Sequence, residues 1–181
     1  MVIFITGGSG SGKSEYAEQR AVEQKRARPG MELIYIATME AKDSESRKRI
    51  ERHRTMRDGK GFQTRECYTH LEELSLGGQE IVLLECLSNL TANEMFSVKG
   101  RKYEAVSVIK KGITHLTEQC SDVIIVGNNV FEDGMQYDEM TEQYLQQMAE
   151  LHRFLAELAD EVVEVICGIP VFWKGENHEV Y

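Results

Sequence analysis

The sequence predicts an α/β protein with a mostly parallel sheet and helices on both of its faces. Three observations predict this class. Short apolar runs recur along the chain, segments of helical length separate them, and a glycine-rich loop joins the first run to the first helix. The runs are continuously apolar rather than alternating, which is typical of parallel strands buried on both faces. Alternation of such strands with helices predicts crossover connections.

Strands are predicted where the apolar runs lie, at 2–6, 33–37, 81–85, 123–126 and 162–166, with a weaker strand at 62–67. Helices are predicted at 13–25, 43–56, 90–96, 104–119 and from about 138 to 160, with a helical turn at 71–74. Gly168, Ile169 and Pro170 are expected to turn the chain into a short tail. Since the chain contains no repeat, linker or low-complexity stretch, residues 1–181 are expected to form one domain.

Composition narrows the class of protein. Hydrophobic residues make up 41% of the 181 residues and the net charge is −9, which disfavours nucleic acid as a partner. No apolar run approaches the ~20 residues that cross a bilayer, so no membrane span is expected. The beginning of the chain lacks the pattern of a signal peptide, and Cys67, Cys86, Cys120 and Cys167 form no zinc or disulfide spacing. These features predict a cytoplasmic protein with reduced thiols.

The glycine-rich loop carries the most specific motif in the chain. The residues Gly7, Gly8, Ser9, Gly10, Ser11, Gly12, Lys13 and Ser14 match the pattern G-x-x-x-x-G-K-S between a strand and a helix. Glycines let backbone N–H groups turn toward phosphate oxygens, and the helix adds its positive N-terminal dipole. Lys13 is expected to reach the β- and γ-phosphates, and the Ser14 hydroxyl to bind Mg²⁺. The motif predicts a P-loop domain that binds GTP, ATP or both.

A phosphate loop needs an acidic residue at the end of a neighbouring strand to hold the metal ion or its water. Glu85 follows the apolar run 81–84 and is the candidate. We therefore predict that Ser14 and Glu85 are the metal residues of the site. An ordinary charged residue at a strand end is the alternative interpretation.

A basic segment between 47 and 60 stands out in an acidic chain. Arg49, His53 and Arg57 are spaced i, i+4, i+8 and share one face of a helix. Guanidinium groups on both sides of His53 would bind phosphate oxygens and lower the pKa of His53, which would leave the imidazole neutral and nucleophilic. A solvated charged helix is the alternative interpretation, and spacing alone favours it.

These motifs, taken in order, resemble the adenosylcobinamide kinase/adenosylcobinamide-phosphate guanylyltransferase family of cobalamin biosynthesis. The resemblance covers most of the chain. After the phosphate loop come Y-I-A-T at 35–38, R-I-E-R-H at 49–53, T-R-E at 64–66, L-L-E-C-L at 83–87, A-D-E-V at 159–162 and G-I-P at 168–170. The phosphate loop is common to many families, whereas the R-I-x-x-H segment and the ordered set are much more specific.

The resemblance implies a RecA-like fold, a trimeric assembly and a bifunctional enzyme with Lys13 and His53 as catalytic residues. Such an enzyme phosphorylates the hydroxyl of adenosylcobinamide, a corrinoid. It then transfers GMP from GTP to the phosphorylated product through a guanylyl-histidine, here on His53. Besides the phosphate loop, the resemblance implies nucleotide contacts from Ala37, Thr38, Met39, Arg54, Thr55, Met56, Arg57, Glu66 and Glu85.

The chain departs from the family pattern at three places: Ser9-Gly10 in the phosphate loop, Asn129 and Phe131 after the fourth strong strand, and the long helix, where His152 replaces an expected asparagine. Two other functions therefore stay open. One is a P-loop kinase of another small alcohol or nucleotide, for which His53 would be dispensable. The other is a regulatory protein that binds a nucleotide and turns it over very slowly.

Overall fold

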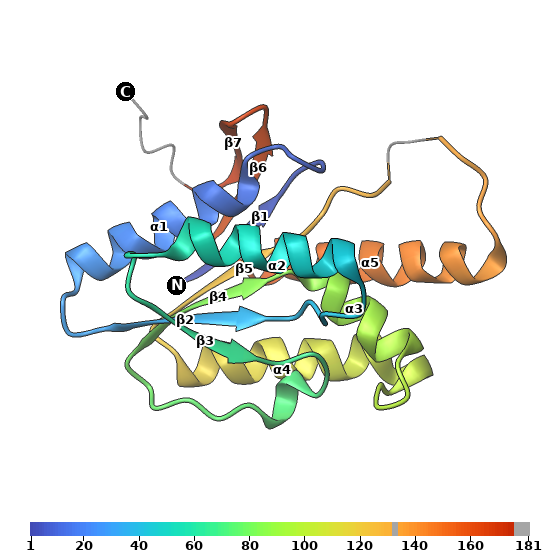
Figure 1. Ribbon diagram of the computed structural model, residues 1–181, viewed down its shortest axis with the longest axis horizontal. Helices are drawn as coiled ribbons and strands as arrows, with labels where there is room; N and C mark the ends of the chain where they lie inside the picture. Colours follow the sequence, from blue (N-terminus) through green and yellow to red (C-terminus); the bar gives the residue numbers. More distant parts are fainter. Residues whose placement is uncertain (132–133, 176–181) are drawn as a thin grey trace.

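A computed structural model describes residues 1–131 and 134–175 (Figure 1). The strands among them are β1 (Val2–Thr6), β2 (Glu32–Ala37), β3 (Phe62–Glu66), β4 (Glu80–Glu85), β5 (Asp122–Val126), β6 (Glu161–Ile166) and β7 (Ile169–Lys174). The α-helices are α1 (Lys13–Ala27), α2 (Ser44–Arg57), α3 (Leu87–Phe96), α4 (Ala105–Gln119) and α5 (Glu139–Leu158). Two 3-10 turns, η1 (Leu71–Glu73) and η2 (Lys102–Glu104), precede β4 and α4 respectively. Each strand and helix that the sequence predicted is present.

The strands form one seven-stranded sheet in the order β3-β2-β4-β5-β1-β6-β7. All neighbours pair in parallel except β6 and β7, which pair antiparallel. The predicted mostly parallel α/β class is confirmed. In this order the carboxyl ends of β1, β2, β4 and β5 meet at one edge of the sheet, where ligands of open α/β sheets bind.

Strand β7 corrects the sequence prediction, which placed a tail after Pro170. Cys167 and Gly168 have φ of 50° and 82°, so they reverse the chain tightly enough for β7 to pair back on β6. Pro170 obscured the strand in the sequence because proline is excluded from central strands. An edge strand tolerates it, and β7 is an edge strand.

Each face of the sheet carries its own apolar core. Ile3, Leu33 and Leu83 point to one face, where they pack with Ala17 and Ala21 of α1. Alternate strand residues pack on the other face against α3, α4 and α5. Helices thus cover both faces, as predicted, and α2 lies on the same side as α1 (Figure 1).

Helix α2 differs from the other helices because it has no apolar face. Its one buried residue is Arg57. Asp43 caps its beginning by accepting a hydrogen bond from the Ser46 N–H, and the Ser46 side chain bonds back to the Asp43 backbone. The cap explains why so polar a segment is helical, since it satisfies donors that a helix start leaves free. Burial of apolar side chains therefore contributes little to holding α2 in its place in the fold.

Among residues 1–131 and 134–175, no helix combines the length and the apolar character needed to span a bilayer.

Candidate active site

The phosphate loop runs from the end of β1 to the start of α1, and two of its glycines are required by close contacts. A Cβ at Gly7 would lie 2.5 Å from the Val165 carbonyl oxygen. Gly12 has φ of 92°, and a Cβ there would lie 3.3 Å from Gly168 Cα. The Gly168 N–H also donates to the Ser11 carbonyl at 2.8 Å, so the turn between β6 and β7 supports the loop.

Lys13 lies over this loop. Its Nζ donates to the Gly8 carbonyl oxygen at 2.9 Å, and the residue is 8% exposed. Burial lowers the pKa of Lys13, while the nearby Cys86 and Glu85 oppose that shift. A buried ammonium group above curled backbone N–H groups is suited to bind phosphate oxygens.

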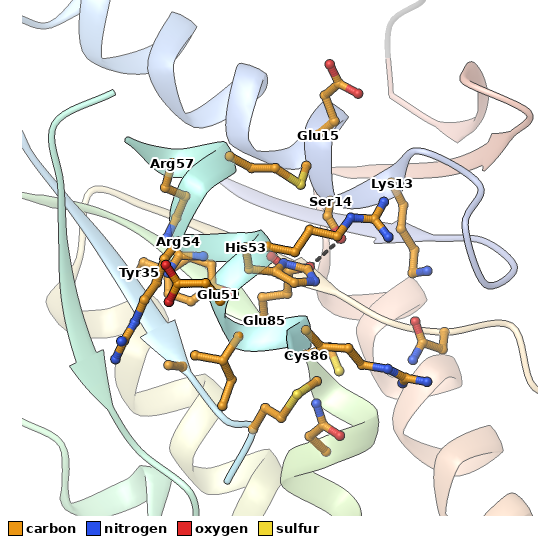
Figure 2. Close-up of a pocket in the computed structure, with 18 of the residues that line it drawn as sticks. Lys13, Ser14, Glu15, Tyr35, Glu51, His53, Arg54, Arg57, Glu85 and Cys86 are labelled. Carbon is orange, nitrogen blue, oxygen red and sulfur yellow. Dashed lines mark hydrogen bonds and ion pairs between the residues drawn. The ribbon is translucent and has the colours of Figure 1, made fainter. Parts of the chain in front are cut away.

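Ser14, Glu85 and His53 converge from three separate elements (Figure 2). Glu85, at the end of β4, is 6% exposed and accepts a short hydrogen bond from the Ser14 hydroxyl. His53 of α2 has its Nδ1 3.5 Å from the same carboxylate oxygen. Burial raises the pKa of Glu85, but the neighbouring His53, Ser14 and Tyr35 outweigh burial, so the net pKa is lowered. Glu85 is therefore an anionic carboxylate at neutral pH.

The residues present fit a magnesium ion. The second carboxylate oxygen of Glu85, Oε2, is buried and has no hydrogen-bond partner. The Ser14 hydroxyl lies beside the same carboxylate. Mg²⁺ prefers oxygen ligands and keeps several waters, and a buried carboxylate next to a P-loop hydroxyl meets that preference.

Helix spacing predicted only part of the surroundings of His53. Arg49 is paired with Glu45 at the surface, with its side chain 62% exposed. The Arg57 guanidinium carbon lies 3.4 Å from the centroid of the Tyr35 ring. Arg49 and Arg57 nevertheless line the same cavity as His53, as their shared helix face predicted, and the Glu85 carboxylate adds a neighbour that lies 3.5 Å from the His53 Nδ1. Spacing within one helix could not predict this contact, because the carboxylate belongs to another element.

One cavity of about 760 Å³ lies at this edge of the sheet. The predicted site residues that line it are Ser9, Gly10, Ser11, Gly12, Lys13, Ser14, Ala37, Met39, His53, Arg54, Met56, Arg57, Glu66 and Glu85. These residues come from the phosphate loop, the ends of β2, β3 and β4, and α2. The structure therefore brings residues far apart in the sequence to a single cavity.

Four predicted contact residues do not line the cavity: Gly7, Gly8, Thr38 and Thr55. Gly7 shapes the loop, and Gly8 offers its carbonyl to Lys13. Thr38 is fully buried; its hydroxyl accepts from the Cys86 N–H at 2.7 Å and donates to the Cys86 carbonyl at 2.9 Å. Thr55 donates to a carbonyl within α2. The two threonine side chains thus bond within the protein, and their contact with a nucleotide stays a prediction.

The sequence interpretation missed other residues of the site. These residues line the cavity from within β2 or from just after β3 and β5: Tyr35, Tyr68, Asn128 and Asn129. Glu18 of α1 was missed too, although it is one helical turn beyond Ser14 and so shares its face. That spacing was the available signal.

Comparison with known proteins gives consistent results. The family model described as cobinamide kinase / cobinamide phosphate guanyltransferase matches residues 3–172. A relative from Escherichia coli, "Bifunctional adenosylcobalamin biosynthesis protein CobU", is 31% identical, covering 94% of this chain and 98% of its own. A protein of the same name from Salmonella typhimurium is 30% identical with the same coverage. "Bifunctional adenosylcobalamin biosynthesis protein CobP" from Pseudomonas aeruginosa is 28% identical over 96% of this chain and 97% of its own.

Among solved structures, an ATPase domain aligns with a TM-score of 0.53 and 11% identity, over 90% of this chain and 68% of that one. At that identity the likeness concerns the fold alone, and it supports the RecA-like arrangement. The family model covers nearly the whole chain, the relatives align end to end, and the cavity holds the phosphate loop and the R-I-x-x-H histidine. The chain belongs to the cobinamide kinase / cobinamide phosphate guanyltransferase family.

Proposed function

We propose that the chain is a bifunctional adenosylcobinamide kinase and adenosylcobinamide-phosphate guanylyltransferase that transfers GMP through His53. One observation carries the proposal. The His53 imidazole lines the phosphate-loop cavity, and its Nδ1 lies 3.5 Å from the Glu85 carboxylate, which accepts a hydrogen bond from Ser14. A nucleophile paired with an orienting acid beside a triphosphate site is the arrangement that covalent nucleotidyl transfer needs. The description of the family, cobinamide kinase / cobinamide phosphate guanyltransferase, supports the same pair of reactions, and the relatives are named as bifunctional proteins of adenosylcobalamin biosynthesis.

The triphosphate would be held by the backbone N–H groups of the loop and by Lys13. Mg²⁺ held by Ser14 and Glu85 would neutralise phosphate charge. Glu85 orients His53 by facing its Nδ1, which leaves Nε2 as the nitrogen with a free lone pair. Nε2 attacks the α-phosphorus of GTP, an N–P bond forms, the bond to the bridging oxygen breaks, and pyrophosphate leaves.

In the second half-reaction a phosphate oxygen of adenosylcobinamide phosphate attacks the same phosphorus. The N–P bond breaks and its electron pair returns to His53. In the kinase step, the acceptor hydroxyl attacks the γ-phosphorus of a triphosphate in the same loop. The bond from that phosphorus to the bridging oxygen breaks, the nucleoside diphosphate leaves, and the hydroxyl proton passes to water. A cavity of about 760 Å³ is at the upper end of the usual range for ligand sites.

Covalent labelling tests the proposal. The protein is incubated with Mg²⁺ and GTP labelled at the α-phosphate, denatured, and assayed for retained label, with ATP and His53→Ala in parallel. Acid-labile, alkali-stable label that is absent from His53→Ala is expected, because phosphoramidates hydrolyse in acid. Triphosphate binding without label would remove the covalent mechanism and leave a kinase without a covalent step.

The proposal includes a homotrimer, as the resemblance implies. Light scattering of the protein should then give about three times the chain mass of 20.6 kDa. A monomer mass at micromolar concentration would contradict this part alone.

A further inference from the structure

Helix α2 carries His53, yet little holds α2 in place. Arg57 is its single buried residue, and its remaining side chains are exposed or half-buried. Burial of apolar side chains is the usual source of helix docking, and α2 has almost none. The position of His53 over the phosphate loop therefore depends on a few polar contacts.

One of these contacts joins α2 to α1 next to the loop. Glu18 of α1 is fully buried, and its Oε2 accepts a hydrogen bond from Lys60 Nζ at 2.7 Å. Lys60 lies in the turn that follows α2, where its N–H donates to the Arg57 carbonyl at 3.1 Å. The ion pair thus fixes the carboxyl-terminal end of α2, one helical turn from His53.

The buried carboxylate of Glu18 also lies close to His53 and Glu85. Oε1 of Glu18 is buried without a hydrogen-bond partner, as is Nδ1 of His53. One donor atom from each of Glu18, His53 and Glu85 lies within 4.8 Å of the others. Such a set also suits a cation, but Lys60 and Arg57 already oppose the charge of Glu18. The charges therefore favour an ion-pair network over a second metal site.

We propose that Glu18 is a positioning residue for His53: its buried ion pair with Lys60 sets how α2 lies on α1, and thereby where the imidazole stands relative to the phosphate loop. This inference rests on the proposed function, because His53 is taken as the nucleophile. A displacement of about 1 Å at a reacting atom costs as much as 100-fold in rate, so loss of the ion pair should act on the transfer step. Nucleotide affinity, which comes from the loop and Lys13, should change little.

Glu18→Gln is the first test. It keeps the size of the side chain and removes the charge that Lys60 pairs with. The initial rate of His53 labelling should fall by about tenfold or more, with GTP affinity within about threefold of the wild type. Glu23→Gln, an exposed carboxylate on the same helix, is the matched control and should label at the wild-type rate.

A second set of variants guards against misfolding. Burial raises the pKa of Glu18, so keeping this carboxylate charged lowers the free energy of unfolding. The Glu18→Gln variant, which has no charge there, should therefore be at least as stable as the wild type. Lys60, whose side chain is 33% exposed, can be changed with little risk. Lys60→Gln should show the same slow labelling as Glu18→Gln, whereas Lys60→Arg, which keeps the positive charge, should label at close to the wild-type rate. The double variant Glu18→Gln/Lys60→Gln should label no more slowly than either single variant, because both changes remove the same ion pair.

Hydrogen–deuterium exchange separates this proposal from the proposed function. Glu18→Gln and Lys60→Gln should speed exchange in residues 44–57 and leave β4 and β5 unchanged. If the wild type takes no label, the covalent mechanism fails while the exchange result still tests the placement of α2. Wild-type labelling rates in both variants, or unchanged exchange in α2, would overturn the role of Glu18.

Discussion

Lys13 and Glu85 are charged at neutral pH, yet they are only 8% and 6% exposed. Buried charges are tolerated when opposite charges and hydrogen bonds offset their desolvation. Here the Glu85 carboxylate accepts a hydrogen bond from the Ser14 hydroxyl, and the Lys13 ammonium group donates one to the Gly8 carbonyl oxygen. Both groups are therefore already desolvated and oriented before a nucleotide arrives, which reduces the cost of binding it.

Lys13→Ala should weaken triphosphate binding. Charge-assisted hydrogen bonds contribute about 1.5–3 kcal/mol each, so a loss of about 10- to 100-fold in affinity is expected. Isothermal titration with Mg²⁺ and GTP or ATP measures it. Lys111→Ala, an exposed lysine of α4 on the opposite face of the sheet, is the control and should bind normally. Normal affinity in Lys13→Ala would disprove the phosphate-loop assignment.

His152 of α5 is enclosed by aromatic rings. Its ring centroid lies 5.0 Å from Phe4 and 5.3 Å from Phe131, edge to face in both pairs. Burial lowers the pKa of His152 from 6.5 to about 4. The unfolded chain therefore takes up this proton first as the pH falls.

The contribution of His152 to the free energy of unfolding should therefore be fully present above about pH 6.5 and should fall as the pH drops toward 4. About 2 kcal/mol should be lost by pH 5. Urea unfolding at pH 7.5 and pH 5 measures the loss. His152→Phe keeps an aromatic ring and removes the titration, so its stability should depend less on pH over this interval by about the same amount. Equal pH dependence in the two proteins would show that His152 does not titrate as expected.

At the scale of elements, α4 packs against η1 through Gly112. A Cβ on this residue would lie 2.7 Å from Leu71 Cβ and 2.9 Å from the backbone nitrogen of Glu72. Two effects of Gly112→Ala therefore oppose each other. Helix propensity favours alanine by about 1 kcal/mol, whereas overpacking costs about 1–3 kcal/mol.

Overpacking should prevail at Gly112, because one of the atoms in the way is backbone and cannot rotate aside. Gly112→Ala should lower the free energy of unfolding by about 1–2 kcal/mol. Thr114→Ala, exposed on the same helix, should be neutral or slightly stabilising. Thermal or urea unfolding compares the two. A Gly112→Ala variant that is more stable than the wild type would mean that η1 can shift away from α4 and make room for the added methyl group.

At the scale of the whole molecule, the site joins both halves of the sheet. The phosphate loop follows β1, Glu85 ends β4, and β5 lies between these two strands. A nucleotide bound there would contact elements on both sides of β5. Ligand binding to the folded state stabilises it as a whole by mass action.

Mg²⁺ and GTP at about 100 times the dissociation constant should stabilise the fold by about 2.7 kcal/mol. A thermal shift assay detects this as a higher melting temperature. Removal of Mg²⁺ with a chelator should reduce the shift, since Glu85 would then face the phosphates without a cation between them. No shift with any triphosphate would contradict nucleotide binding.

Local sequence was sufficient to predict the phosphate loop and every α-helix and strand except β7. The loop is contiguous, and its strand and helix are adjacent in the chain, so spacing alone located Lys13 and Ser14. Glu85 could be proposed because it ends an apolar run. Strand β7 could not be predicted in the same way, because Pro170 is tolerated only at an edge, and which strand is an edge depends on the whole sheet.

The sequence by itself determined the fold class, the phosphate loop and, by resemblance, the family. Only the tertiary structure showed that the Glu85 carboxylate faces His53, that Thr38 hydrogen-bonds to Cys86 in the turn after β4, and that Glu18 pairs with Lys60. The physical reason is the same in each case. These contacts join side chains of separate elements, and the order of the strands and the docking of α1 and α2 decide which side chains meet.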